Sequence, residues 1–394
     1  MNLIPKNFEP EINLRISKIQ KELNSEDIEA LLIGSNVNIY YSSGRFFRGY
    51  VLITGRGETF WFVIKPNIIE AETNKVFLIR KPEDIPGILK KLGFEAFSSI
   101  GLEENDLSYS DIIRLQKLFP EAILKNASLA LKRARMVKTE WELGEMAVDG
   151  KHHVNVYRQV KDCYKPGMTD LEFQIEIERR LRLEGSLGVS RVSGNLMEIN
   201  LGSVITGENA DNPSPYEFTM GGKGMHPVLP VGASNESIEE HHPVMIDMNG
   251  AFNGYQTDMT RVWCLGEVSE LAQKAHDCSI EILRCLEKLS VPGTPVSSLY
   301  QTAMEIVENH NLKEYFMGHN SQVGFIGHGV GIELNELPVL NAKSKDILLE
   351  NMTIAIEPKF VIPHVGAVGV ENTYVVKKEG LENLTVFPEE IQKL

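Results

Sequence analysis

Residues 244–263, VMIDMNGAFNGYQTDMTRVW, decide the fold of this chain. Three apolar residues lead into Asp247, Gly250 permits a tight turn, and the chain returns through Tyr255 to Asp258. This order predicts a β-hairpin with one carboxylate on each arm. Because strand side chains alternate between faces, the two aspartates share a face only if the turn preserves the register. Either aspartate alone is explained as well by a turn at the end of a strand. The pair indicates a functional site only if other residues of the chain can join it.

Three candidate partners lie downstream. His328 stands between two glycines in GHGVGIELNELP, where the backbone can approach closely. Glu357 ends the apolar strand of TIAIEPKF, and Glu371 opens the strand of GVENTYVV. Two aspartates, two glutamates and one histidine suit two divalent ions of the Mn, Fe, Co or Zn type that share bridging carboxylates. Such ions also offset the repulsion among four clustered carboxylates.

These five residues lie in the short motifs DMNG, DMTR, GHGVG, IEP and VEN, and the set resembles the motifs of the pita-bread metallopeptidases. That group includes Xaa-Pro aminopeptidases, prolidases and methionine aminopeptidases, with creatinase as a metal-free relative. The resemblance implies an α/β (α+β) chain whose catalytic domain, residues 131–394, has two αβ halves related by a pseudo-twofold axis. Residues 1–130 resemble the N-terminal domain of the creatinase and prolidase branch.

The pattern of the first 130 residues agrees with a small α/β domain. Apolar residues recur at helical spacing from Ile12 to Leu23, and GYVLIT and TFWFVI flank residues 55–57 as in a β-hairpin. Further strands and helices alternate after them, which predicts a mixed sheet. No GxGxxG follows the first strand, so nothing supports a dinucleotide site.

Helix signals organise the second domain. Thr139 with Glu142, and Thr169 with Glu172, form two predicted capping boxes. A Pro-Gly pair precedes the second of these helices and recurs at residues 292–293 before another helical pattern. This weak repeat has two explanations, chance or the pseudo-twofold symmetry that the resemblance implies.

Composition limits the partners and the compartment. The chain has 394 residues, which suggests two or three domains, and its formal net charge is −14, which argues against nucleic acid or an anionic membrane as partner. The N-terminus lacks the apolar core of a signal peptide, and no apolar run is long enough to span a bilayer. Four cysteines without CxxC spacing are typical of free thiols. We therefore expect a cytoplasmic protein.

The resemblance also implies roles for individual residues. His328 and Glu357 would bind one ion and Asp247 the other, while Asp258 and Glu371 would bridge both. Two ions lower the pKa of a bridging water, and Glu357 would take its proton and pass it to the leaving amine. Thr260 and Arg261 follow Asp258 directly and would orient the ligands. Arg261 is explained equally well as a strand-end charge.

Several departures from the family pattern concern the substrate. Asn335 occupies the position of the family's His in His-Glu-x-Pro, Gly324 that of a second His, and Gly369 that of an Arg. No His falls near residues 213–215, where the family's upstream substrate His should stand. Metal chemistry is retained while groups that hold a peptide's carbonyl and carboxylate are replaced. We therefore expect Asn335 and His226, which lies in a long loop rich in Gly, Pro and Asn, to contact substrate.

Three functions compete on this evidence. The first is a two-metal hydrolase of the Xaa-Pro aminopeptidase or dipeptidase type, acting on a small peptide or small amide. The second is a metal enzyme of the same scaffold that acts on a non-peptide C–N bond or as a lyase. The third, a non-catalytic binding protein, is disfavoured because it has no need of four clustered carboxylates. The resemblance also implies a homodimer, and NIYYSSGRFFRGY has the aromatic and Arg content of interfaces.

Overall fold

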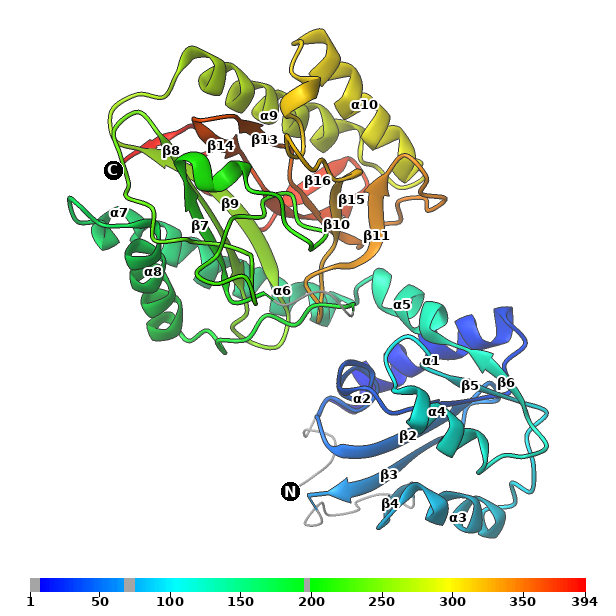
Figure 1. The fold of residues 1–394 in the computed structure, drawn as a ribbon. Coiled ribbons are helices and arrows are strands. Elements are labelled where there is room, and N and C mark those ends of the chain that lie inside the picture. The colour runs from blue at the N-terminus through cyan, green and yellow to red at the C-terminus, as the bar shows by residue number, and fades with distance from the viewer. Residues whose placement is uncertain (1–7, 67–74, 195–198) are drawn as a thin grey trace. The chain divides into compact units, whose positions relative to one another are not determined.

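The computed structural model describes residues 8–66, 75–194 and 199–394 (Figure 1). The chain divides into two compact units, Met1–Arg135 and Met136–Leu394. This division falls at the end of α5 (Ser128–Met136), whereas the sequence pattern suggested a boundary at residue 130. None of the helices in the described ranges combines the length and apolarity needed to cross a bilayer.

A six-stranded sheet forms the first unit, in the order β4-β3-β2-β1-β5-β6. β1 pairs antiparallel with β2 and parallel with β5, so the sheet is mixed, as predicted. The strands are β1 (Ala30–Ile33), β2 (Arg48–Thr54), β3 (Thr59–Lys65), β4 (Val76–Leu78), β5 (Ser99–Leu102) and β6 (Ile123–Asn126).

The helices of the first unit include one whose apolar face was predicted from the sequence. α1 (Glu9–Ser25) buries Ile12, Ile16 and Leu23, which confirms the predicted helix face. The remaining elements are α2 (Asn36–Ser43), η1 (Pro82–Asp84), α3 (Ile85–Lys91) and α4 (Tyr109–Gln116). α2 begins where the hydroxyl of Ser35 accepts a hydrogen bond from the Asn38 N–H, the usual chemistry of an N-cap.

The second unit contains three sheets, in the orders β17-β9-β8-β7, β11-β10-β12-β15-β16 and β13-β14. Their strands are β7 (Gly202–Thr206), β8 (Pro243–Gly250), β9 (Thr257–Cys264), β10 (Phe325–Gly329), β11 (Glu336–Asn341), β12 (Thr353–Ile356), β13 (Lys359–Ile362), β14 (Gly366–Gly369), β15 (Asn372–Lys377), β16 (Gly380–Asn383) and β17 (Gln392–Lys393). An isolated bridge between Thr260 and Glu371 joins the first sheet to the segment between β14 and β15.

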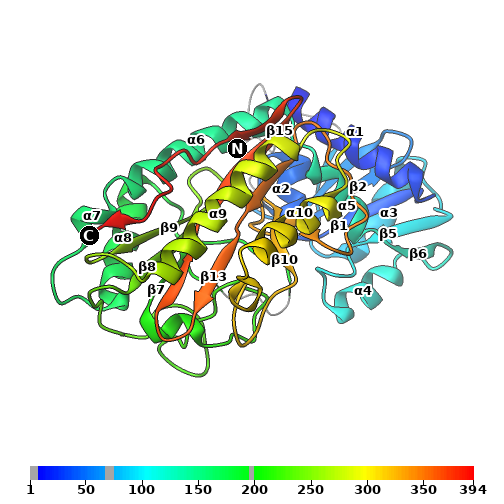
Figure 2. The ribbon, with the colours of Figure 1, turned by 90° about the horizontal axis from the view of Figure 1, so that it is seen from above.

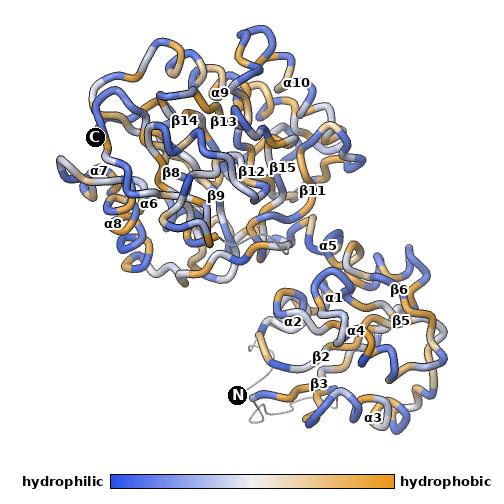
Figure 3. Tube along the Cα trace, in the orientation of Figure 1, coloured by the Kyte–Doolittle hydropathy of each residue, from blue (hydrophilic) through white to orange (hydrophobic). Residues whose placement is uncertain are grey.

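Helices cover both faces of these sheets. They are α6 (Glu140–Tyr157), α7 (Val160–Cys163), α8 (Asp170–Glu184), α9 (Glu270–Leu289) and α10 (Val296–Asn309), with short turns η2 (Gly207–Asp211) and η3 (Lys313–Tyr315). Both predicted capping boxes are present, at the starts of α6 and α8. Figure 2 shows α9 crossing β13 on the side away from α6 and α8. Apolar and polar residues alternate along α8 and α9 in Figure 3, as expected for helices with one buried face.

Strand β8 separates two hydrophobic cores. Its Val244, Ile246 and Met248 pack with α6 and α8, whereas Met245 packs with α9 and α10. Side chains on a strand alternate, so Asp247 shares the face of Met245. The same alternation on β9 sends Met259 to the first core and leaves Asp258 on the second face. The two aspartates therefore point toward the same side of the hairpin.

Candidate metal centre

The β8–β9 hairpin and a second hairpin supply the four carboxylates. Asp247 pairs with Thr260 and Asp258 with Asn249, so the aspartates are diagonal neighbours on one face. In the second hairpin Ile356 pairs with Asn372 and Lys359 with Gly369. Glu357 and Glu371 lie between these two pairs and therefore face each other across the arms.

His328 completes the set from β10. It pairs with Ala355 of β12, beside the second hairpin. Its Nε2 lies 3.8 Å from Asp258 Oδ2 and 3.5 Å from Glu357 Oε1. Its Nδ1 lies 3.1 Å from the Gly329 carbonyl oxygen, which favours the tautomer with the proton on Nδ1 and leaves Nε2 as a ligand atom. The structure thus places all five predicted ligands around one centre.

Two carboxylate oxygens in this centre are buried without a hydrogen-bond partner in the described residues, Asp258 Oδ1 and Glu371 Oε1. Burying a carboxylate oxygen without a partner destabilises the folded state by about 1–3 kcal/mol or more, and a bound cation would offset this cost. One ligand atom each of Asp258, His328 and Glu371 lies within 4.8 Å of the others. This oxygen-rich set with one imidazole fits a divalent ion of the Mn, Fe, Co or Zn type.

Lys359 is a member of the centre that sequence reasoning missed. Its Nζ donates to Asp247 Oδ2 at 2.9 Å, to Glu357 Oε2 at 2.9 Å and to Glu371 Oε2 at 2.8 Å. The side chain is 2% exposed, and a lysine is buried to this degree only when its charge is paired. The spacing carried a signal, because residues two apart on an extended strand share a face, and Lys359 follows Glu357 by two.

The charges of the centre shift the pKa values of its members. Burial raises the pKa of Glu371 to about 8, against the lowering effect of the Lys359 ammonium. Burial and the Glu371 carboxylate also raise the pKa of Asp258. At Glu357 burial acts in the same direction, but the Lys359 ammonium and the His328 ring outweigh it and lower the pKa. Asp258 and Glu371 are therefore the two carboxylates that most favour additional positive charge.

Three residues contact the candidate ligands or the backbone beside them. Thr260 Oγ1 donates to Glu371 Oε2 at 2.8 Å, and Thr219 Oγ1 donates to Glu357 Oε2 at 2.9 Å. Arg261 is fully buried and donates to the carbonyl oxygens of Thr260 and Glu371 at 2.8 Å each. These two contacts are with the backbone beside the candidate ligands. Thr219 was missed because it lies in a loop whose sequence gives no sign of this contact.

The centre opens into a pocket of about 710 Å³. Asn335 lines this pocket, but its amide is paired with the backbone of Ser193, accepting from the N–H at 2.7 Å and donating to the carbonyl at 2.9 Å. Gly324 also lines it. His226, the other expected substrate residue, is exposed and accepts from the Val228 N–H, and it is not among the residues that line the pocket.

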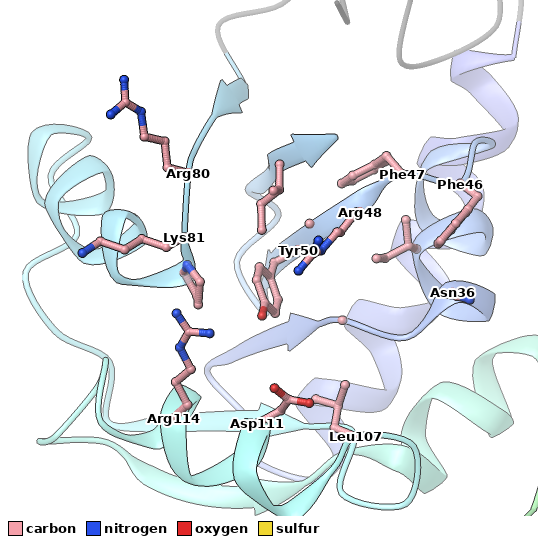
Figure 4. Close-up of a pocket in the computed structure, with 15 residues that line it drawn as sticks. Asn36, Phe46, Phe47, Arg48, Tyr50, Arg80, Lys81, Leu107, Asp111 and Arg114 are labelled. Carbon is pink, nitrogen blue, oxygen red and sulfur yellow. The ribbon is translucent and has the colours of Figure 1, made fainter. Parts of the chain in front are cut away.

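A separate pocket of about 470 Å³ lies in the first unit (Figure 4). Tyr50 and Arg114 point into it, and Arg80 points away from Tyr50. Arg114 makes two hydrogen bonds to the carboxylate of Glu83, at 2.7 and 2.8 Å. Burial, with the nearby Asp111 carboxylate, raises the pKa of Tyr50. Among the described residues, none lines both this pocket and the pocket of the metal centre.

Comparison with known families covers both units. Residues 145–378 match metallopeptidase family M24, and residues 15–137 match the creatinase/prolidase N-terminal domain. The Xaa-Pro dipeptidase of Pyrococcus horikoshii is 26% identical over 384 residues, covering 96% of this chain and 99% of that protein. The Xaa-Pro dipeptidase of Pyrococcus furiosus is 25% identical over 387 residues, with the same coverage.

Solved structures show the same fold. The prolidase from Pyrococcus horikoshii superimposes with a TM-score of 0.77 at 24% identity, covering 96% of this chain and 99% of that one. The Xaa-Pro dipeptidase from Bacillus anthracis gives a TM-score of 0.80 at 20% identity with the same coverage. The predicted fold, a creatinase-like N-terminal domain followed by a pita-bread domain, is confirmed.

Proposed function

The chain belongs to metallopeptidase family M24, a family of hydrolases, and from that premise we propose that it cleaves amide bonds as an enzyme of the Xaa-Pro aminopeptidase or dipeptidase type. The observation that carries this proposal is the cluster of Asp258, His328 and Glu371. In it two buried carboxylate oxygens have no hydrogen-bond partner among the described residues, and Asp258 and His328 line the pocket. Mn, Co, Zn and Fe all suit such ligands. A divalent ion held there supplies a Lewis acid that polarises a carbonyl and lowers the pKa of water.

Glu357 is the residue that we assign to proton transfer. Its Oε2 accepts hydrogen bonds from Thr219 and Lys359, which fix the carboxylate, while its Oε1 faces His328 at 3.5 Å from Nε2. One oxygen therefore orients the group and the other remains directed at the centre. A carboxylate held in this way can take a proton from water and deliver it to the leaving amine. Although burial acts in the opposite direction, the Lys359 ammonium and the His328 ring lower the pKa of Glu357, which favours its ionised form.

The pocket favours an apolar substrate without a free carboxylate. Phe218, Met220 and Leu334 are among its apolar lining residues and suit a proline ring or another apolar group. Of the described residues that line it, only His328 and Lys359 have basic side chains, and both face the clustered carboxylates. The C-terminal carboxylate of a dipeptide therefore meets no available cation. We infer that longer Xaa-Pro peptides or neutral amides are better substrates than Ala-Pro.

The same observation supports a second candidate function. A site that keeps its candidate metal ligands but has no available cation among its described residues to bind a substrate carboxylate suits a metal enzyme that acts on a non-peptide C–N bond or as a lyase. The two candidates differ in what occupies the pocket, since a peptide presents several backbone amides and a small amide presents one. A non-catalytic binding role explains less, because it gives no reason for the unpaired oxygens of Asp258 and Glu371.

A substrate panel tests the proposal. Ala-Pro, longer Xaa-Pro peptides and small neutral amides are compared with Mn, Co and Zn, before and after exhaustive chelation. We expect metal-dependent turnover, with Ala-Pro well below the best substrate. Hydrolysis of Ala-Pro with kcat/KM of about 10⁴ M⁻¹s⁻¹ or above would support a plain dipeptidase and remove the altered-substrate proposal. Activity that survives chelation in full would contradict metal dependence.

Asn335→His provides the internal comparison. Histidine at this position can donate to a scissile carbonyl and can become cationic, whereas an amide cannot. In the wild type both ends of the amide are paired with Ser193. If Asn335 narrows the substrate range, Asn335→His increases turnover of Ala-Pro by about 10-fold or more. Unchanged turnover would locate the restriction elsewhere in the pocket.

Assembly and location complete the proposal. We propose a cytoplasmic homodimer without nucleic-acid or membrane partners. Phe46 is exposed, and it lines the first-unit pocket together with Arg48 (Figure 4); aromatic and Arg side chains are enriched at interfaces. Light scattering at micromolar concentration tests the dimer, and a single species of monomer mass would contradict it.

A further inference from the structure

The Lys359 ammonium lies where a second metal ion would have to bind. Its Nζ is 2.8–2.9 Å from one oxygen each of Asp247, Glu357 and Glu371. A divalent ion bound to these three oxygens, at about 2.0–2.2 Å from each, would overlap the position of Nζ. An ion and an ammonium group therefore cannot occupy this half of the centre together.

Two of the three oxygens that contact Lys359 already accept two hydrogen bonds each. Glu357 Oε2 accepts from Thr219 Oγ1 and from Lys359 Nζ. Glu371 Oε2 accepts from Thr260 Oγ1 and from Lys359 Nζ. Each carboxylate oxygen offers two lone pairs, so neither atom has one left for a metal ion. The donors to these two oxygens, Thr219, Thr260 and Lys359, come from three different segments of the chain.

The other half of the centre has the opposite character. Asp258 Oδ1 and Glu371 Oε1 have no hydrogen-bond partner in the described chain, and both are buried. His328 Nε2 lies between Asp258 and Glu357, 3.8 Å and 3.5 Å from their nearest oxygens. This half has ligand atoms without a cation, whereas in the Lys359 half the ammonium is present and the contacting oxygens of Glu357 and Glu371 are fully paired.

We propose that this centre binds one divalent ion, held by Asp258, His328 and Glu371, and that the ammonium group of Lys359 takes the place of the second ion. The inference rests on the proposed metal dependence but not on the proposed substrate. Asp247 is then a partner of the lysine and not a metal ligand. The two-ion centre expected from the sequence becomes a centre with one ion and one built-in cation.

Charge supports this assignment. Four carboxylates and one ammonium leave a formal charge of three negative. One divalent ion reduces this charge to one negative, and two would make the buried centre positive. Like charges a few ångströms apart repel strongly in a buried site, where water screens them poorly. A second ion therefore gains little from the carboxylates once Lys359 is among them.

Metal content after dialysis, measured by inductively coupled plasma mass spectrometry, tests the proposal without reference to activity. We expect about one Mn²⁺ per wild-type chain and about two per Lys359→Ala chain, because the variant removes both the charge and the obstructing atoms. Lys343→Ala, an exposed lysine of the same unit, is the matched control and should bind one. Manganese spin resonance adds a second readout, since only two adjacent ions give an exchange-coupled spectrum.

Two aspartate variants keep the test valid if Lys359→Ala fails to fold. Asp258→Asn should lose the ion, whereas Asp247→Asn should still bind one. Two ions in the wild type, or loss of the ion in Asp247→Asn, would overturn the role of Lys359 and leave metal dependence intact. One ion in both the wild type and a folded Lys359→Ala would also overturn that role. No ion in the wild type would overturn both this inference and the proposed metal dependence.

Discussion

Lys359 and Gly369 stand directly opposite each other in the β13–β14 ladder, and the glycine makes room for the lysine. A Cβ at position 369 would lie 2.8 Å from Lys359 Cα, 3.2 Å from Lys359 Cγ and 2.6 Å from the Pro358 carbonyl oxygen. An arginine at position 369, as in the family pattern, would therefore clash with the backbone of the strand that carries Lys359. The absence of a side chain at position 369 and the inward position of Lys359 are therefore structurally linked.

Gly369→Ala tests this packing. We expect a loss of about 1–3 kcal/mol in the free energy of unfolding, because the added Cβ meets backbone and φ is +148°. Urea unfolding followed by fluorescence measures it. Gly293→Ala is the matched control, since Gly293 also has positive φ, +98°, but no atom of the described residues lies within 4 Å of an added Cβ. Equal losses in the two variants would show that backbone strain alone, and not contact with the lysine strand, accounts for the effect.

The Thr260 hydroxyl should matter for metal affinity. It donates to Glu371 Oε2, so Thr260→Val leaves this carboxylate less well oriented. Loss of a hydrogen bond to a ligand weakens metal binding by about 10–100-fold. Calorimetric titration with Mn²⁺ measures the change, and Thr260→Ser, which keeps the hydroxyl, should retain most of the affinity. Matching affinities in the valine and serine variants would rule out the orienting role.

Asp149 should make stability depend on pH. Burial raises its pKa to about 7 from the ordinary 3.8, although the Phe252 N–H and the Thr257 hydroxyl donate to it. Because the folded pKa lies above the unfolded one, this contribution to stability is fully present below about pH 4. It is lost as pH rises through 7, by up to about 1.4 kcal/mol per pH unit.

Asp149→Asn removes the titrating group and should flatten the dependence of unfolding free energy on pH between 5 and 7. Urea unfolding at several pH values measures this slope. The exposed Asp162→Asn serves as control and should keep the wild-type slope. A wild-type slope in Asp149→Asn would contradict the assignment.

Arg261 should be important for stability. Its guanidinium also donates to Pro388 and Phe387 carbonyl oxygens and to Asn372 Oδ1, which ties the C-terminal segment to β9. A lysine ammonium cannot reach these acceptors with the same geometry. We expect Arg261→Lys to lower the free energy of unfolding by about 3 kcal/mol or more, measured by thermal unfolding. A change below about 1 kcal/mol would show that the segment is held by other contacts.

Much of the fold could be predicted because its signals are local. The hairpin of Asp247 and Asp258 depends on alternation and a turn, and the caps at Thr139 and Thr169 depend on residues three apart. The five candidate ligands could be picked out because each stands at the edge of a strand or beside a glycine. Residue spacing within one segment is enough for inferences of this kind.

The rest of the site depends on contacts that sequence spacing does not reveal. Asn335 is paired with Ser193, 142 residues away, and Thr219 reaches Glu357 across 138 residues. Lys359 was missed for another reason, because a lysine after a strand end is ordinarily exposed. Only the continuation of the chain into β13, opposite Gly369, turns it inward.

Anomalous diffraction from a crystal of the full chain soaked in Mn²⁺ tests the account most directly. We expect one anomalous peak within coordination distance of Asp258, His328 and Glu371, with Lys359 Nζ still in contact with Asp247, Glu357 and Glu371. Two peaks, with the lysine side chain displaced, would contradict the one-ion centre. The absence of any peak among these residues would contradict the metal centre itself.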